Sequence, residues 1–172
     1  NTIVIVVSDH GYHLGEKDHW HKSTMWERSM RIPFMIKLPN PYDEGRALET
    51  PVSALDLYPT LTSYLNLSDP EHDLEGIDLV PLLQGHREKR GRPVVSTLYR
   101  GYHSVRDDRF RYIRYPDGSQ ELYDLNKDPW EWKNLAAQKK FAEKIRELDS
   151  FIPLTEEETV GHVGASGDAV VK

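Results

Sequence analysis

The stretch "TIVIVVSDHG", residues 2–11, decides the fold. Its β-branched opening, "TIVIVVS", is typical of a strand that is buried on both faces, as in the parallel sheet of an α/β protein. Asp9 and His10 follow at the carboxyl end of that strand, where open α/β sheets gather ligands and catalytic groups. Gly11 lets the backbone turn, so both side chains can converge on one metal ion. As an alternative, Asp9 caps the following turn and His10 hydrogen-bonds to it.

The loop after this strand adds further polar side chains. Lys22, twelve positions past His10, carries an ammonium on a long stem and suits an anionic substrate; the alternative is a solvated lysine at the start of a helix. His13, His19 and His21 could add metal ligands, but loop histidines beside tryptophan also serve as packing or surface residues. Their spacing does not define the four-ligand cage of a structural zinc site.

Up to residue 85 the chain alternates between helix and strand patterns. Ser23 is predicted to be the N-cap of the first helix. The apolar stripe of the second is formed by Leu57, Leu61, Tyr64 and Leu65. The segments are "STMWERSM" (23–30, helix), "RIPFMIKLP" (31–39, buried strand), "SALDLYPTLTSYLNL" (53–67, helix) and "IDLVPLLQG" (77–85, short helix). This order predicts the α/β fold class.

The pattern changes after the basic link "HREKRGRP", residues 86–93. Four short alternating runs predict an antiparallel meander, with "PDGS" as the hairpin turn before the last strand: "VVSTLYR" (94–100), "YHSVRDD" (102–108), "FRYIRYP" (110–116) and "QELYDL" (120–125). "KKFAEKIRELDSFI" (139–152) predicts a closing amphipathic helix. We therefore expect α/β elements over residues 1–90, an antiparallel subdomain with its helix over 91–152, and a mobile or strap-like tail over 153–172.

Composition restricts the classes of function. The 172 residues are 38% hydrophobic and 29% charged, which fits a globular protein with one core. A net charge of -6 without a basic tract argues against nucleic-acid binding, and no apolar run approaches the ~20 residues of a membrane-spanning helix. The absence of cysteine excludes disulfides, a thiol nucleophile and thiolate zinc sites.

The block "SDHGYHLGEKDHWHKSTMWERSMRIPFMIKLP", residues 8–39, resembles the C-terminal metal-and-sulfate motif of the type I sulfatases. These enzymes belong to the alkaline-phosphatase-like superfamily, and the block is most similar to the iduronate-sulfatase-like branch. "ALDLYPTL", "VRDDRFRYIRY" and "ELYDLNKDPWEWKNLA" follow in the order that the family shows, so the resemblance covers roughly residues 1–150. It implies hydrolysis of a sulfate ester, on a sulfated small molecule or a sulfated sugar.

The resemblance also implies roles for single residues. Asp9 and His10 would complete the coordination of a divalent cation, normally calcium, while Lys22 would contact a sulfate oxygen and stabilise the growing charge of the transition state. Calcium prefers oxygen ligands, so His10 leaves the identity of the metal open. Arg100 and His103, between the first two meander strands, could border the pocket and bind a sugar carboxylate, with a surface role as the alternative.

The chain departs from the family in one respect. Sulfatases of this family form their nucleophile by oxidising Cys or Ser in a C/S-x-P-x-R motif to formylglycine, and this sequence contains no such motif. We therefore expect the formylglycine and the remaining metal ligands in an upstream part of the same enzyme, and expect this C-terminal portion to be inactive alone. A periplasmic, secreted or lysosome-like location agrees with the resemblance.

Two other functions stay open at this point. One is a phosphate or phosphonate ester hydrolase of the same superfamily, and the other is a non-catalytic protein that keeps the sulfatase shape.

Overall fold

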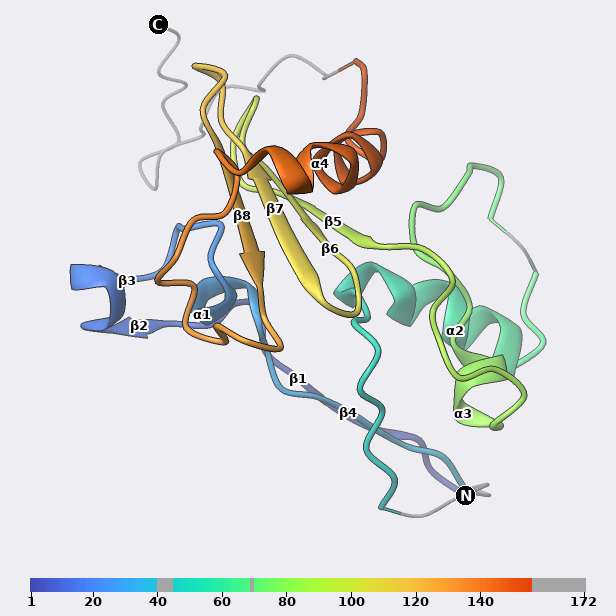
Figure 1. Ribbon diagram of the computed structural model, residues 1–172. Coiled ribbons are helices and arrows are strands. Elements are labelled where there is room, and N and C mark those ends of the chain that lie inside the picture. Colours follow the sequence, from blue (N-terminus) through green and yellow to red (C-terminus); the bar gives the residue numbers. More distant parts are fainter. Residues whose placement is uncertain (40–44, 69, 156–172) are drawn as a thin grey trace, which may run out of the picture.

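The computed structural model describes residues 1–39, 45–68 and 70–155. The second half of the chain forms an antiparallel meander in which four consecutive strands are neighbours in space (Figure 1). These strands are β5 (Val94–Thr97), β6 (His103–Arg106), β7 (Phe110–Arg114) and β8 (Gln120–Asp124). The predicted meander is therefore confirmed, because each short alternating run became one strand.

The turn between β7 and β8 has the predicted hairpin chemistry. The N–H of Tyr115 donates to the carbonyl of Ser119, and Gly118 has a φ of 81°. A positive φ is accessible to glycine without steric cost, which explains why "PDGS" closes this hairpin.

The closing helix covers one face of the meander (Figure 1). A short 3-10 turn, η3 (Lys139–Phe141), leads into α4 (Ala142–Asp149). Val105, Tyr112 and Leu122 lie opposite one another on β6, β7 and β8 and form a fully buried row. Leu148 of α4 packs against this row. Burying such a row contributes hydrophobic stabilisation to this half.

The first predicted strand forms, but the described residues do not cover it on both faces, and its burial in the complete enzyme stays a prediction. β1 (Val4–Val7) pairs antiparallel with β4 (Phe34–Lys37) in a two-stranded sheet. Val4, Val6 and Met35 are 48%, 48% and 57% exposed. The face with Val4, Val6 and Met35 is open, whereas Ile5 and Ile36 on the other face are half-buried. Side chains that suit a central strand therefore meet solvent on one face.

The helices between β4 and β5 differ in detail from the prediction. η2 (Ala54–Asp56) runs directly into α2 (Leu57–Tyr64), followed by α3 (Val80–Leu83). Thr60 and Thr62 are the buried residues of α2, whereas the predicted apolar stripe is only half-buried. Thr60 can be buried because its hydroxyl donates to the carbonyl of Asp56 and accepts from the N–H of Leu79.

The first predicted helix is short. α1 spans Glu27–Met30 with Trp26 as its N-cap residue, so Ser23 is not the N-cap; Ser23 has a φ of 71° and belongs to the preceding loop. No helix of the described ranges is long and apolar enough to cross a membrane. The predicted division at residue 90 stays a prediction, and residues 156–172 of the predicted tail lie outside the described residues.

Candidate functional site

Asp9 and His10 stand where β1 ends, and backbone contacts fix the turn that carries them. The hydroxyl of Ser8 donates to the carbonyl of His10 at 2.9 Å, and the N–H of His10 donates to Asp9 Oδ1 at 3.0 Å. Gly11 lies against the α1 region, where its N–H donates to the carbonyl of Ser29 at 2.8 Å and an added Cβ would collide with backbone. Only glycine permits this approach, so Gly11 anchors the turn.

The hydrogen bonds of His10 define which ring nitrogen is available. Its Nδ1 lies 2.8 Å from the carbonyl oxygen of Gly11, an acceptor only, so Nδ1 carries the hydrogen of the neutral ring. Nε2 then presents a lone pair outward. A metal ion or a cationic side chain can use that lone pair.

Lys22 meets His10 at that nitrogen. Its Nζ lies 2.9 Å from His10 Nε2, and Asp9 Oδ2 lies 3.4 Å from the same nitrogen. The structure therefore brings Asp9, His10 and Lys22 together, although twelve positions separate Lys22 from His10. We call these three residues the polar cluster.

The carboxylate of Asp9 is open to solvent, with its side chain 83% exposed. Desolvation acts to raise the pKa of Asp9, but its interactions with His10, Lys22 and nearby backbone N–H groups outweigh this, and the pKa is lowered. An ionised carboxylate beside an imidazole lone pair supplies two donors for a divalent cation. The described ranges contain no group of three or more His, Cys, Asp or Glu that could hold a metal ion, so the predicted cation site stays a prediction.

A strained loop holds Lys22 in place. It contains β2 (His13–Leu14), the 3-10 turn η1 (Glu16–Asp18) and β3 (Trp20–His21), and β2 pairs with β3. Four of its non-glycine residues have positive φ: Lys17, Asp18, His21 and Ser23. Such conformations persist only where surrounding contacts enforce them.

The other loop histidines take packing roles. His13 is fully buried, its Nε2 lies 2.9 Å from Thr24 Oγ1, and burial lowers its pKa. Its ring packs edge to face against His19, with the ring centroids 5.1 Å apart. His21 Nδ1 lies 2.8 Å from the hydroxyl of Tyr12. These contacts favour the packing alternative for His13 and His19.

Arg100 and His103 lie at the β5–β6 connection. Arg100 is exposed in the turn. His103 is only 1% exposed in β6, with Nδ1 2.9 Å from Thr97 Oγ1, so a ligand cannot touch its ring in this conformation. The predicted substrate role of Arg100 stays a prediction, whereas the burial of His103 argues for packing within the sheet.

Behind the loop lies a set of buried charges that the sequence did not reveal. Glu27 and Glu131 face Arg106 and Arg111, and we call these four residues the charge cluster. Arg111 and Glu131 are 3% and 1% exposed. Arg111 in "FRYIR" and Glu131 in "DPWEW" are as typical of solvated charges, so the sequence does not indicate that they are buried together.

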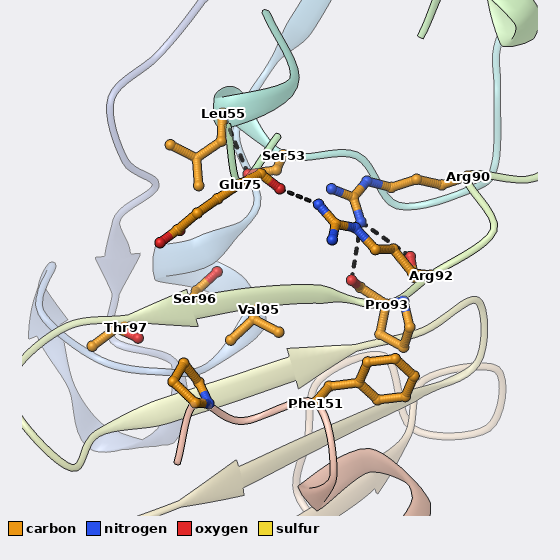
Figure 2. A pocket seen from close by; sticks show the side chains of 11 residues that line it. Ser53, Leu55, Glu75, Arg90, Arg92, Pro93, Val95, Ser96, Thr97 and Phe151 are labelled. Carbon is orange, nitrogen blue, oxygen red and sulfur yellow. Dashed lines mark hydrogen bonds between the residues drawn. The ribbon is translucent and has the colours of Figure 1, made fainter. Parts of the chain in front are cut away.

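A cavity of about 700 Å³ lies elsewhere, between the Ser53–Leu55 turn, Arg92 and strand β5. Figure 2 shows Arg90 and Arg92 at its edge, with Arg90 bonded to the carbonyls of Arg92 and Pro93. Arg90 also pairs with the buried carboxylate of Asp56 at 2.7 Å. The charge of Arg90 is thus already paired with Asp56, and no member of the polar cluster lines this cavity. We therefore take the polar cluster, and not the cavity, as the candidate site.

Sequence comparison places the chain among known proteins. Residues 15–157 match the family described as N-sulphoglucosamine sulphohydrolase, C-terminal. The chain is 37% identical over 155 residues to a sulfatase of Formosa agariphila, covering 90% of this chain and 30% of that protein. It is 32% identical to a Delta 4,5-hexuronate-2-O-sulfatase of Bacteroides thetaiotaomicron, covering 88% of this chain and 35% of that protein. The chain thus spans about a third of the length of these relatives.

Solved structures agree in fold. A 2-O GAG sulfatase superposes with a TM-score of 0.73 at 28% identity, over 86% of this chain and 34% of that one. The phosphonate monoester hydrolase of Agrobacterium radiobacter superposes with a TM-score of 0.72 at 29% identity, over 86% of this chain and 33% of that one. These similarities confirm the predicted fold class.

Proposed function

The chain belongs to the sulfatases, in the family of N-sulphoglucosamine sulphohydrolase C-terminal regions, and on that premise we propose that it serves the hydrolysis of sulfate esters. It would act as the C-terminal region of the enzyme. The observation that carries the proposal is the polar cluster, in which the ammonium of Lys22 lies 2.9 Å from the lone-pair nitrogen of His10.

Each member of the polar cluster has a role in this proposal. Lys22 would bind a sulfate oxygen, and its charge would stabilise the more anionic transition state. Asp9 and His10 would hold part of a divalent cation site, with calcium as the first candidate. A bound cation would withdraw charge from the sulfuryl group.

We propose a sulfated sugar as the substrate class. Two of the relatives described above are named as sulfatases of a hexuronate and of a GAG, both at a 2-O position. Arg100 is exposed and could pair in a bidentate way with a sugar carboxylate. The nucleophile would be a formylglycine contributed by an upstream part of the same enzyme.

A phosphonate ester hydrolase is the second candidate, because one structural relative is a phosphonate monoester hydrolase. The same ammonium and cation would fit a phosphoryl group, since both groups present anionic oxygens. Parallel assays of the complete enzyme with an aryl sulfate and an aryl phosphonate separate these candidates. The proposal requires a larger kcat/KM for the sulfate.

Lys22→Ala in the complete enzyme tests the role of the polar cluster. Removing one charge-stabilising donor should lower kcat/KM by roughly two to three orders of magnitude. Lys127→Ala is the matched control, because Lys127 is an exposed lysine just beyond β8. Its replacement should leave kcat/KM unchanged. Near-normal kcat/KM for Lys22→Ala would remove Lys22 from the active site and overturn the proposal.

A further inference from the structure

The loop that carries Lys22 is tied to the meander on both sides of that lysine. We define the lysine loop as residues 15–31. Lys17 and Glu27 stand five positions before and after Lys22, and both contact Glu131, which lies in the segment between β8 and α4. The ammonium of Lys17 donates to the carbonyl oxygen of Glu131, and the N–H of Glu27 donates to Glu131 Oε2 at 2.8 Å. One residue therefore fixes the two flanks of the lysine.

Glu131 is built to stay in this position. Its side chain is 1% exposed, and its φ of 59° turns the backbone so that side chain and carbonyl face the same loop. Burial raises its pKa, and the nearby charge of Arg111 opposes that rise. A buried carboxylate in a strained backbone is retained only where its contacts compensate for both costs.

Arg111 completes the attachment from the centre of the sheet. Its Nε lies 3.0 Å from Glu131 Oε1, its Nη2 donates to the carboxylate of Glu27, and its Nη1 donates to the carbonyl of Met25 at 3.3 Å. One guanidinium thus contacts both the lysine loop and Glu131. The planar fork of arginine suits such multiple pairing, which lysine could not reproduce.

Aromatic contacts strengthen the attachment at Lys17. Its ammonium lies 4.4 Å from the ring centroid of Trp26 and 4.8 Å from that of Tyr123. The indole N–H of Trp26 donates to Glu121 Oε2 on β8 at 2.7 Å. The lysine loop is therefore held by charge, by hydrogen bonds and by ring contacts.

We propose that Glu131, together with Arg111, is a positioning residue that keeps Lys22 beside His10 by clamping both flanks of the lysine loop. This inference rests on the proposed function, because it takes Lys22 as the group that meets the substrate. Glu131 itself acts through the loop and touches no reacting atom.

The first measurement is the amide hydrogen exchange of residues 15–31 in the complete enzyme. Glu131→Gln keeps the shape of the side chain but removes its charge, and should speed exchange in the lysine loop by about tenfold or more while leaving β6 and β7 protected. Asp124→Asn is the matched control, because it also neutralises a nearly buried carboxylate, which lies at the end of β8 and pairs with Arg109. Equal exchange of the loop in both variants would overturn the proposal.

The second measurement is a double-mutant cycle with Lys22→Ala. Glu131→Gln alone should lower kcat/KM by about tenfold to a hundredfold, through kcat more than KM, and should add little in the Lys22→Ala background. If Glu131→Gln acted only by general destabilisation, the double variant would lose kcat/KM by the product of the two single losses. That result would overturn the proposal. If Lys22→Ala alone were harmless, the proposed function would fail, and hydrogen exchange would still decide the clamp.

Lys17→Met is a second test of the proposal, for the case that the Glu131 variant does not fold. It cuts the tie from the loop side, leaves the charge cluster intact, and keeps a flexible chain between the rings of Trp26 and Tyr123. It should reproduce faster loop exchange and the non-additive loss with Lys22→Ala. A Lys17→Met enzyme with wild-type loop exchange would overturn the proposal.

Discussion

Replacing Asp56 by alanine should destabilise the fold more than any exposed acidic substitution. Asp56 is fully buried and Arg90 is 5% exposed. Two guanidinium nitrogens of Arg90 donate to the carboxylate at 2.7 and 2.8 Å, and the N–H groups of Ser53 and Ile77 each donate at 2.9 Å. Asp56→Ala therefore removes four hydrogen bonds and the only anionic partner that Arg90 has in these contacts.

The size of the effect follows from what remains. Arg90 keeps two carbonyl acceptors, those of Arg92 and Pro93, but its buried charge is no longer neutralised. Breaking a buried ion pair by removing one partner costs about 3–5 kcal/mol of unfolding free energy. Equilibrium urea unfolding, compared at equal m-values, measures this loss.

Asp108→Ala is the control, because Asp108 forms an ion pair of similar length with Lys89 at 2.7 Å but on the surface. Exposed pairs contribute little, so its unfolding midpoint should barely move. A loss for Asp56→Ala no larger than that for Asp108→Ala would refute the reasoning.

The same pair predicts a pH dependence. Burial acts to raise the pKa of Asp56, but hydrogen bonds from Arg90, Ser53 and Ile77 outweigh it, and the pKa falls below its ordinary value of 3.8. Because the folded pKa is depressed, the stabilisation is fully present above that ordinary value and is lost as pH falls through the folded pKa. The free-energy difference between wild type and Asp56→Ala should therefore shrink only in strong acid, below about pH 4.

Three further outcomes are expected. The 172-residue chain should not turn over an aryl sulfate, because it contains no C/S-x-P-x-R motif; enzymatic turnover in a preparation free of other sulfatases would contradict this. The chain should self-associate through the exposed ribbon face, and Val6→Lys with Met35→Lys should reduce association in sedimentation velocity; a monomeric wild-type chain would count against it. Asp9→Asn in the complete enzyme should weaken calcium binding in a titration, and unchanged affinity would remove Asp9 from the metal site.

Local sequence patterns predicted most of the second half of the fold. Period-two alternation and an Asp-Gly turn specify a hairpin from neighbouring residues alone, and the helix over residues 139–152 has a clear apolar stripe. The β1 region was harder to predict, because a β-branched run does not reveal its partner or what covers it. Pairing with β4, thirty residues away, depends on the intervening loop.

The candidate residues could be picked out where they are close in sequence or match a family motif, and their roles stay predictions. Asp9 and His10 are adjacent, and the resemblance supplied Lys22. Glu131 could not be found in this way, because its contact with Glu27 spans 104 positions and an isolated acid in a loop ordinarily faces solvent. Long-range pairing of buried charges leaves no periodic trace in a sequence.

The left-handed backbone of the lysine loop also bears on how the protein is made. Lys17 is translated 114 positions before Glu131, whose carbonyl oxygen accepts a hydrogen bond from the Lys17 ammonium. A ribosome therefore exposes the loop long before Glu131 is made. Four non-glycine residues of the loop have a positive φ, which is energetically unfavourable until the contacts with Glu131 can form. The loop should therefore be among the last segments to order during synthesis. In a nascent chain halted before Asp128, the lysine loop with Lys22 should still be disordered.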